Sequence, residues 1–536
     1  MIREGEFVRA REVVRRSGLA VELEQQLRAG KGGAPRQLDV ETLLAACIVV
    51  FGTGQRSATL IKVHQVLTED IVVSLQDRLG VRRKIGRRWQ VLTLRQVRYL
   101  FKRICTLLDY SPHTTSLTSD ERAAREDETF RWLNELVRAS VPTDVPHADT
   151  LGVDATSIRT AARPRGPLPS AKGEDDYRGD SAFARQAGGS WDPDARHGHQ
   201  TKTHENANDS FFGHVLLAGV GIHPAKSEFA TLKLVEALVV TPNGYNTPKP
   251  TLRMLDEYRA AGHDLAKVLV DRGFSYWEAS GWADELLTRE VAQTIDMHPA
   301  DRGARPDPAT GVLMIDGWPY VPWTPKHLHA IPPPPHLVVR EPKPGAATDK
   351  HDAYRTNLAA LEKFRRAQAE LAQYALTPNG RARKDGSRQF KVPQHRRDLA
   401  TARDRRMKVY NQPTLVLPAS VATKLRQEHR WGSDAWIADY SRRTAIEAVF
   451  GNMKARDGEG VQRGWIRVVG LAATAIMTTF AIVHYNLRMV RTWARRTGFQ
   501  NDDMLLARDR AIAGYEEIAL DDDEPPAALS PPTAAA

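Results

Sequence analysis

The stretch that decides the fold of this chain lies near its C-terminal end, where residues 440–454 read YSRRTAIEAVFGNMK. Apolar residues recur through it and no proline interrupts it, so the pattern predicts a single helix. At about 100° per residue, four side chains would share one face of that helix: Tyr440, Arg443, Glu447 and Lys454. A carboxylate among cationic and hydrogen-bonding groups suits a site that holds a metal ion beside a phosphate. A solvated helix face with spaced ion pairs is the alternative.

The composition indicates a basic globular protein with several domains. The chain has 536 residues and a formal net charge of +11 at pH 7, which favours a polyanionic partner. Its cysteines are Cys47 and Cys105, too few for a disulfide framework or a cysteine-rich zinc site. A reducing cytoplasm is therefore the expected compartment. The first six residues, MIREGE, carry charge where a signal peptide would need an apolar core.

An apolar run at residues 468–483 resembles a membrane span at first sight. It is shorter than the ~20 residues that a span needs, and it contains three threonines. We interpret it as a helix buried in a soluble core, with no membrane partner.

Residues 1–145 are predicted to form a helical N-terminal DNA-binding domain. Apolar periodicity predicts helices near 21–27, 40–51, 58–66 and 94–108, with Asp39 and Thr93 as N-caps of the second and last. Between the helices lies a basic run with one aromatic residue, Trp89. Its cations are expected to contact DNA phosphates, although a solvated basic loop is the alternative: Arg82, Arg83, Lys84, Arg87 and Arg88.

Two predicted strands each carry a carboxylate. Residues 151–158, LGVDATSI, read as a buried strand that contains Asp154. Residues 266–274, AKVLVDRGF, read as a buried strand that ends on Asp271. An acid in such a run must be exposed at a cleft, paired or bound to a metal. Residues 159–210 look like a long mobile connection, and its histidines are interpreted as solvated loop residues: His197, His199 and His204.

The order of the predicted elements indicates an α/β fold with an RNase H-like core. Three strands are followed by helix, strand, helix and strand, which predicts a mixed five-stranded sheet flanked by helices. Glu447 would supply a third acid from a later helix. The predicted parts are the core at 146–298 and 431–497, a domain inserted at 299–430, and an acidic, Pro/Ala-rich tail at 498–536.

The inserted domain has a heterogeneous pattern. Residues 311–323 alternate like a β-hairpin around Asp316-Gly317, and residues 352–374 read as an amphipathic helix. A strongly basic stretch follows at 381–408. It is either a disordered loop or a groove along DNA, and we expect DNA contacts from Arg396 and Arg397.

Carboxylates at Asp154, Asp271 and Glu447 would together suit two Mg²⁺ or Mn²⁺ ions, which prefer oxygen ligands. Such a pair of ions activates a water or a 3′-hydroxyl and stabilises the leaving oxygen at phosphorus. Arg443 and Lys454 would hold the phosphate in place.

These residues resemble a known family. The spacing Y-(2)-R-(3)-E-(6)-K at 440–454 matches the YREK pattern, and Asp271-Arg272-Gly273-Phe274 resembles the family's second-acid motif. The pieces at Phe211–His214 and Gly470–Arg488 are also similar. The chain thus resembles a bacterial insertion-sequence DDE transposase of the YREK-bearing group, over residues 145–495.

The resemblance implies a function and partners. Asp154, Asp271 and Glu447 would be the catalytic and metal-binding triad, and Tyr440, Arg443 and Lys454 would contact phosphates of the transposon end. The enzyme would cut at terminal inverted repeats and join the 3′-hydroxyl ends to target DNA, as a homodimer on double-stranded DNA in a bacterial cytoplasm. A metal-dependent endonuclease without strand transfer, or a catalytically dead DNA-binding relic, are the alternatives.

Overall fold

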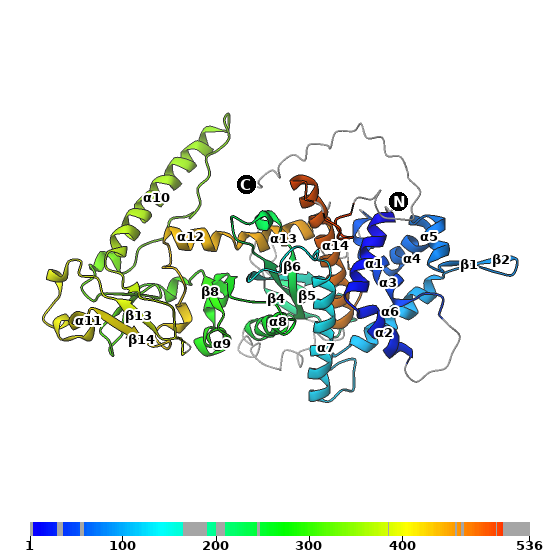
Figure 1. Cartoon of the computed structure of the whole chain (residues 1–536), viewed down its shortest axis with the longest axis horizontal. Coiled ribbons are helices and arrows are strands. Elements are labelled where there is room, and N and C mark those ends of the chain that lie inside the picture. Colours follow the sequence, from blue (N-terminus) through cyan, green and yellow to red (C-terminus); the bar gives the residue numbers. More distant parts are fainter. Residues whose placement is uncertain are drawn as a thin grey trace.

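The computed structural model describes residues 4–28, 36–53, 58–163, 190–199, 210–243, 247–383, 385–455, 458–461, 466–499 and 501–507. Most of the acidic tail, and His204, lie outside these ranges. Figure 1 shows the N-terminal helices at one end of the molecule, the main sheet in the middle and the inserted domain at the other end.

The N-terminal region is helical, as predicted. The N-cap carboxylate of Asp39 accepts a hydrogen bond from the Thr42 amide, and Thr93 forms a reciprocal capping box with Gln96. Both predicted caps are therefore confirmed. The helices are α1 (Glu4–Arg16), α2 (Leu19–Arg28), α3 (Val40–Val49), α4 (Leu60–Gln65), α5 (Val73–Arg78), α6 (Leu94–Leu108) and α7 (Ser119–Arg138), with single-turn segments at Val50–Gly52 and Val66–Asp70.

The basic run is a β-hairpin rather than an irregular loop. Strands β1 (Arg82–Ile85) and β2 (Arg88–Val91) pair antiparallel, with Ile85 opposite Arg88. Gly86 has a φ of 59°, which a two-residue hairpin turn requires. The hairpin projects away from the helices into solvent (Figure 1).

The central sheet is mixed and has the order β4-β5-β3-β7-β8, with β6 also paired to β5. β3 lies antiparallel to β5 and parallel to β7, and β7 lies parallel to β8. The prediction of an α/β fold with a mixed sheet and flanking helices is confirmed. The strands are β3 (Thr150–Arg159), β4 (Arg196–His199), β5 (Ser210–Gly221), β6 (Val235–Pro242), β7 (Lys267–Val270) and β8 (Ala292–Ile295).

Strand β4 corrects the interpretation of residues 159–210 as one long mobile connection. It pairs with the start of β5, and the ring of His197 packs 4.9 Å from that of Phe212. Burial lowers the pKa of His197. His197 is therefore a packed strand residue and not a solvated loop histidine.

The helix predicted between the last two strands of the core is short. Single 3-10 turns occupy Arg272–Tyr276 and Ala279–Gly281, and α9 spans Ala283–Thr288. Between β6 and β7 lies α8 (Pro248–Ala260), which begins with proline in its first turn, where the missing N–H costs nothing.

The apolar run that follows Glu447 lies in α14 (Leu471–Thr497), whose first half is almost completely buried. α14 packs against β6, α3 and α7. One continuous apolar core joins the N-terminal helices, the sheet and α14. Within the described residues, no helix is long and apolar enough to cross a membrane.

The inserted domain has a second apolar core. The predicted hairpin is confirmed, with Ile315 paired to Trp318 and positive φ at both turn residues, Asp316 and Gly317. The long helix α10 (Thr348–Ala372) extends from the domain (Figure 1). The inserted domain also contains two three-stranded sheets. The first consists of β9 (Ala304–Pro306), β10 (Leu313–Ile315) and β11 (Trp318–Tyr320). The second consists of β12 (Thr377–Pro378), β13 (Arg388–Lys391) and β14 (Thr414–Leu417), and the short helix α11 (Lys408–Asn411) precedes β14.

The prediction of one uninterrupted helix at 440–454 is wrong. Helix α12 (Asp434–Ser441) ends before a turn at Arg442 and Arg443, and α13 (Thr444–Lys454) begins after it. Across the turn the backbone bonds span three residues instead of four: the Ala445 amide donates to the Arg442 carbonyl and the Ile446 amide to the Arg443 carbonyl. The guanidinium of Arg442 is held outside the helix by the carbonyl oxygens of Ile222 and His223.

Candidate functional site

The register of the central strands brings two of the predicted acids together. In the parallel ladder of β3 and β7, Val153 lies opposite Val270. The next residue in each case is an aspartate: Asp154 follows Val153 within β3, and Asp271 follows Val270 directly after β7. Neighbouring strands lie about 4.8 Å apart, so the two carboxylates share one end of the sheet. This is the edge at which α/β proteins bind ligands.

Asp271 also organises the turn that follows it. Its Oδ1 accepts a 2.8 Å hydrogen bond from the Gly273 amide, and it caps the 3-10 turn at Arg272–Tyr276. A Cβ at position 273 would lie 2.8 Å from that same oxygen. A side chain at position 273 would therefore force the carboxylate of Asp271 to shift from its present position.

Arg443 joins the third acid to the first. Its Nη1 lies 3.1 Å from Oδ2 of Asp154, and its Nη2 donates to Oε1 of Glu447 one helical turn later. Helix α13 packs against β3. The guanidinium is mostly buried, whereas Glu447 is half exposed.

The electrostatics of Asp154 reflect this crowding of carboxylates. Burial, followed by the charge of Asp271, raises the pKa of Asp154 to about 6. Glu447 adds to the increase, while the Ala155 amide and Arg443 oppose it. Burial and the two neighbouring carboxylates together therefore outweigh the ion pair with Arg443 in setting the pKa of Asp154.

The other two members of the YREK set flank the acids. Lys454 donates through Nζ to Oγ1 of Thr156, which lies two residues beyond Asp154 on the same face of β3. Burial lowers the pKa of Lys454. The ring of Tyr440 stacks on Trp436 at 4.7 Å and lies 5.5 Å from the Arg443 guanidinium.

A buried carboxylate fixes α12 on the sheet. Asp439 accepts hydrogen bonds from Lys267 of β7 and Thr294 of β8, and from Arg442 in the turn. Although burial opposes ionisation, the hydrogen bond from Thr294 and the charge of Lys267 lower the pKa of Asp439. Asp439 is thus a positioning residue for Tyr440 and Arg443, and the sequence pattern gave no sign of it.

The sequence analysis also missed Asp296. In the ladder of β7 and β8, Val270 lies opposite Ile295, so Asp296 follows β8 at the same edge as Asp271. Its Oδ1 accepts from Nε1 of Trp431 at 3.1 Å. The signal was available, because an aspartate ends each of two consecutive strands that a parallel crossover would place side by side.

The remaining predicted DNA contacts lie elsewhere. Figure 1 places the hairpin β1–β2 and the inserted domain on opposite sides of the sheet. Arg82 stacks on Trp89 with its Cζ 3.9 Å from the ring centre, and Arg83, Lys84, Arg87 and Arg88 are exposed. Arg397 lies 3.9 Å over the ring of Tyr410, and Arg396 pairs with Asp398 at 3.4 Å.

The carboxylates are suitable metal ligands by type but do not form a complete ligand set. Among the residues that the structure describes, no group of three or more His, Cys, Asp or Glu could hold a metal ion. Arg443 lies between Asp154 and Glu447 instead. Burial is the largest cause of the raised pKa of Asp154, and the charges of Asp271 and Glu447 add to it; a divalent cation would oppose that contribution of the two carboxylates.

No family model, curated protein or solved structure matches this chain.

Proposed function

We propose that this chain is a metal-dependent DNA transposase that cleaves the ends of an insertion sequence and joins them to target DNA. The observation that carries the proposal is the pairing of Val153 with Val270, because this register sets Asp154 beside Asp271. Arg443 then links Asp154 to Glu447 through two ion pairs. The strand order of the sheet, with β5 antiparallel to β3, supports an RNase H-like core. The YREK spacing supports a transposase over other enzymes on that core.

In this proposal Asp154, Asp271 and Glu447 would hold two Mg²⁺ or Mn²⁺ ions once Arg443 no longer lies between Asp154 and Glu447. When bound, these ions supply an activated water or 3′-hydroxyl and stabilise the leaving oxygen. Arg443 would release Glu447 and turn its planar fork to a DNA phosphate, and Lys454 would add a point charge about two turns beyond Glu447 on α13. Tyr440, fixed by its stack on Trp436, would orient the same phosphate.

The decisive experiment uses purified protein, Mg²⁺ and a plasmid that carries the inverted repeats flanking the gene. We expect 3′-hydroxyl termini at the repeat ends and joined products. Cleavage without joining would identify an endonuclease without strand transfer. Duplex binding without cleavage in Mg²⁺ or Mn²⁺ would identify a catalytically dead DNA-binding protein.

The hairpin β1–β2 is proposed to contact the DNA backbone. Replacing Arg82, Arg83, Lys84, Arg87 and Arg88 by glutamine should reduce the slope of log K against log salt by about 4.5, since each phosphate contact contributes roughly 0.9. Fluorescence anisotropy of a labelled duplex at several salt concentrations measures that slope.

A matched control removes the same charge from a different surface. Helix α10 carries five exposed cations whose replacement by glutamine serves this purpose: Lys350, Arg355, Lys363, Arg365 and Arg366. An equal loss of slope in both variants would mean that net charge, rather than the hairpin, sets the affinity.

A further inference from the structure

Two aromatic side chains lie on the loops that leave the edge of the sheet where Asp154 and Asp271 stand. Asp271 directly follows β7 and Asp296 directly follows β8, so both loops begin at this edge. Tyr276 ends the 3-10 turn that Asp271 caps, and His298 lies two residues after Asp296. The two rings are in contact, with their centres 4.8 Å apart and their planes at 48°. Tyr276 is 64% exposed. We call Tyr276 and His298 the aromatic platform.

Hydrogen bonds fix the backbone on both sides of the platform. Oγ of Ser275 donates to the carbonyl oxygen of Arg272 at 2.8 Å and accepts from the His298 amide at 3.0 Å, so it ties the two loops together. Nδ1 of His298 accepts from the Ala300 amide at 3.2 Å, which holds the imidazole ring. A single exposed aromatic side chain is ordinary on a protein surface. An exposed ring on a fixed turn, in contact with a second fixed ring, instead offers a preformed flat surface to a ligand.

The platform lies close to the acidic site. Tyr276 is five residues beyond Asp271, along a segment with 3-10 geometry. A 3-10 helix rises about 2.0 Å per residue, so the two residues are roughly 10 Å apart. Successive nucleotides of one strand of duplex DNA rise about 3.4 Å. A strand with a phosphate at Asp271 therefore reaches Tyr276 within about three nucleotides.

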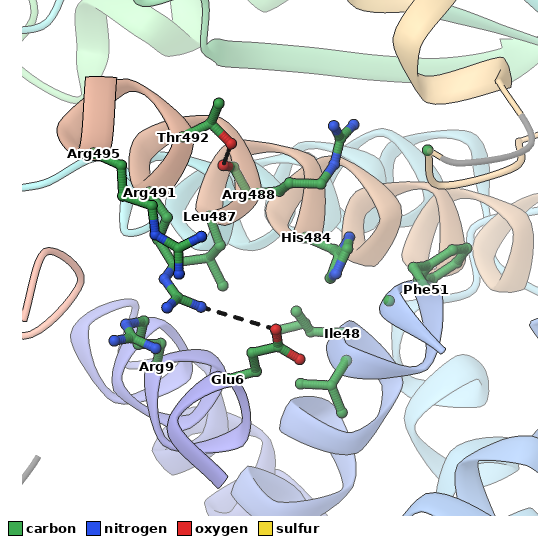
Figure 2. Close-up of a pocket in the computed structure, with 13 residues that line it drawn as sticks. Glu6, Arg9, Ile48, Phe51, His484, Leu487, Arg488, Arg491, Thr492 and Arg495 are labelled. Atoms are coloured by element: carbon green, nitrogen blue, oxygen red, sulfur yellow. Dashed lines mark hydrogen bonds and ion pairs between the residues drawn. The ribbon is translucent and has the colours of Figure 1, made fainter. Parts of the chain in front are cut away.

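A cation lies in the same turn as Tyr276. Arg272 is exposed, and among the residues that the structure describes none forms an ion pair or a side-chain hydrogen bond with its guanidinium. The pocket beside α14 differs in this respect (Figure 2): there Arg491 pairs with Glu6 at 3.8 Å, and Arg488 pairs with Glu459 at 2.9 Å. Arg272 thus offers its fork of donors to a phosphate next to the platform.

We propose that Tyr276 and His298 stack an unpaired base of the DNA strand whose phosphate lies at the acidic site. The proposal rests on the transposase function proposed above. Every base has a flat π-face, so aromatic side chains bind bases with little regard to sequence. Inside an intact duplex these faces are covered by neighbouring bases, so the ligand is a nucleotide that has left the stack. A ring for the base beside a guanidinium for the phosphate matches a nucleotide rather than an apolar segment of protein.

The first test compares two labelled duplexes of the inverted repeat, one blunt and one with three unpaired flanking nucleotides. Fluorescence anisotropy measures their binding to the full chain, with Ca²⁺, which also prefers oxygen ligands, in place of Mg²⁺ to slow cleavage. We expect the wild type to bind the overhang duplex more tightly than the blunt one. Tyr276→Ala should bind the overhang duplex at least about fivefold more weakly than the wild type and the blunt duplex equally well.

Two further variants are the controls. Tyr276→Phe keeps the ring and should bind both duplexes as the wild type does. Tyr354→Ala removes a ring from α10 and should also leave both affinities unchanged. Equal affinity of the wild type and Tyr276→Ala for the overhang duplex would overturn the proposal. An equal loss on both duplexes would also overturn it, because a blunt duplex offers no unpaired base.

A second measurement reports stacking directly. The fluorescent base 2-aminopurine in the overhang is quenched when it stacks on another ring. Its fluorescence should fall on binding to the wild type, Tyr276→Phe and Tyr354→Ala, but not on binding to Tyr276→Ala. Equal fluorescence with the wild type and Tyr276→Ala would overturn the proposal.

The outcomes separate the platform from the transposase function. If the plasmid is not cut but Tyr276→Ala loses the preference for the overhang, the transposase proposal fails and the platform stands. If the plasmid is cut and joined but Tyr276→Ala binds both duplexes as the wild type does, the platform fails and the transposase proposal stands.

Discussion

The variant Asp154→Asn is expected to lose strand cleavage by at least about 1,000-fold, which corresponds to about 4 kcal/mol of transition-state stabilisation. The amide keeps the shape of the carboxylate and its place beside Asp271. It removes the negative charge on which metal binding depends. Duplex binding should be retained, because the basic hairpin is unchanged. Cleavage of a plasmid that carries the repeats, with duplex affinity measured in parallel, tests both parts.

The same variant should be more stable than the wild type at neutral pH. The folded pKa of Asp154, about 6, exceeds the ordinary value of 3.8, so folding favours the protonated carboxyl. The ionised form thus costs stability: the cost is absent below pH 4, grows as the pH rises from 4 to 6, and is fully present above pH 6. A shift of about two pH units amounts to roughly 1–3 kcal/mol. The Tm of Asp154→Asn should exceed that of the wild type at pH 7.5 and equal it near pH 4.

The control is Asp127→Asn, because Asp127 is 68% exposed and pairs with Arg253 on the surface. Its stability should follow that of the wild type at both pH values. Cleavage by Asp154→Asn at the wild-type rate would refute the triad. A variant that is less stable than the wild type at pH 7.5 would mean that the ion pair with Arg443 outweighs the burial and repulsion of the carboxylate.

The parts of the fold that could be predicted from the sequence depend on local chemistry. Asp39 and Thr93 are helix caps because their side chains reach an amide three residues later, and the hairpin at Asp316-Gly317 depends on residues that tolerate positive φ. The strands with Asp154 and Asp271 stand out as apolar runs with one acid. In each case the residues that determine the cap, turn or strand lie within a few positions of it in the sequence.

What could not be predicted depends on tertiary contacts. The turn at Arg442 is stabilised by carbonyl oxygens of Ile222 and His223, more than 200 residues earlier in the chain. Helix periodicity contains no information about such a long-range contact, so the prediction of a single helix at 440–454 was wrong. Strand β4 was missed for the same reason, because its ladder partner β5 supplies the apolar packing for His197.

For the candidate site, the sequence predicted which residues are involved, but it could not predict which of them contact one another. Spacing brought Tyr440, Arg443, Glu447 and Lys454 to attention. The register of β3, β7 and β8 adds Asp296 to the same edge as Asp154 and Asp271. The role of Asp439 depends on three partners from separate elements.

The second large effect is expected at the free edge of β6, where helix side chains complete the hydrogen bonding of the strand. Asn486 of α14 accepts from the Val235 amide at 3.0 Å and donates to the Val235 carbonyl at 2.8 Å. Asn134 of α7 forms the same pair of bonds with Leu238, at 2.7 and 3.0 Å. Both asparagines are completely buried. An unpaired strand edge is thereby closed by two helices.

The variant Asn486→Leu should reduce the free energy of unfolding by about 3–5 kcal/mol. Leucine has a similar shape, but it leaves the amide and carbonyl of Val235 buried without partners, at about 1–3 kcal/mol each, and Ser140 also loses its bond to Nδ2 of Asn486. Asn134→Leu should cost a similar amount through Leu238. Denaturant midpoints measure both, with Asn357→Leu on α10 as control. If the three variants unfold at the same midpoint, water reaches this edge and the asparagines do not close it.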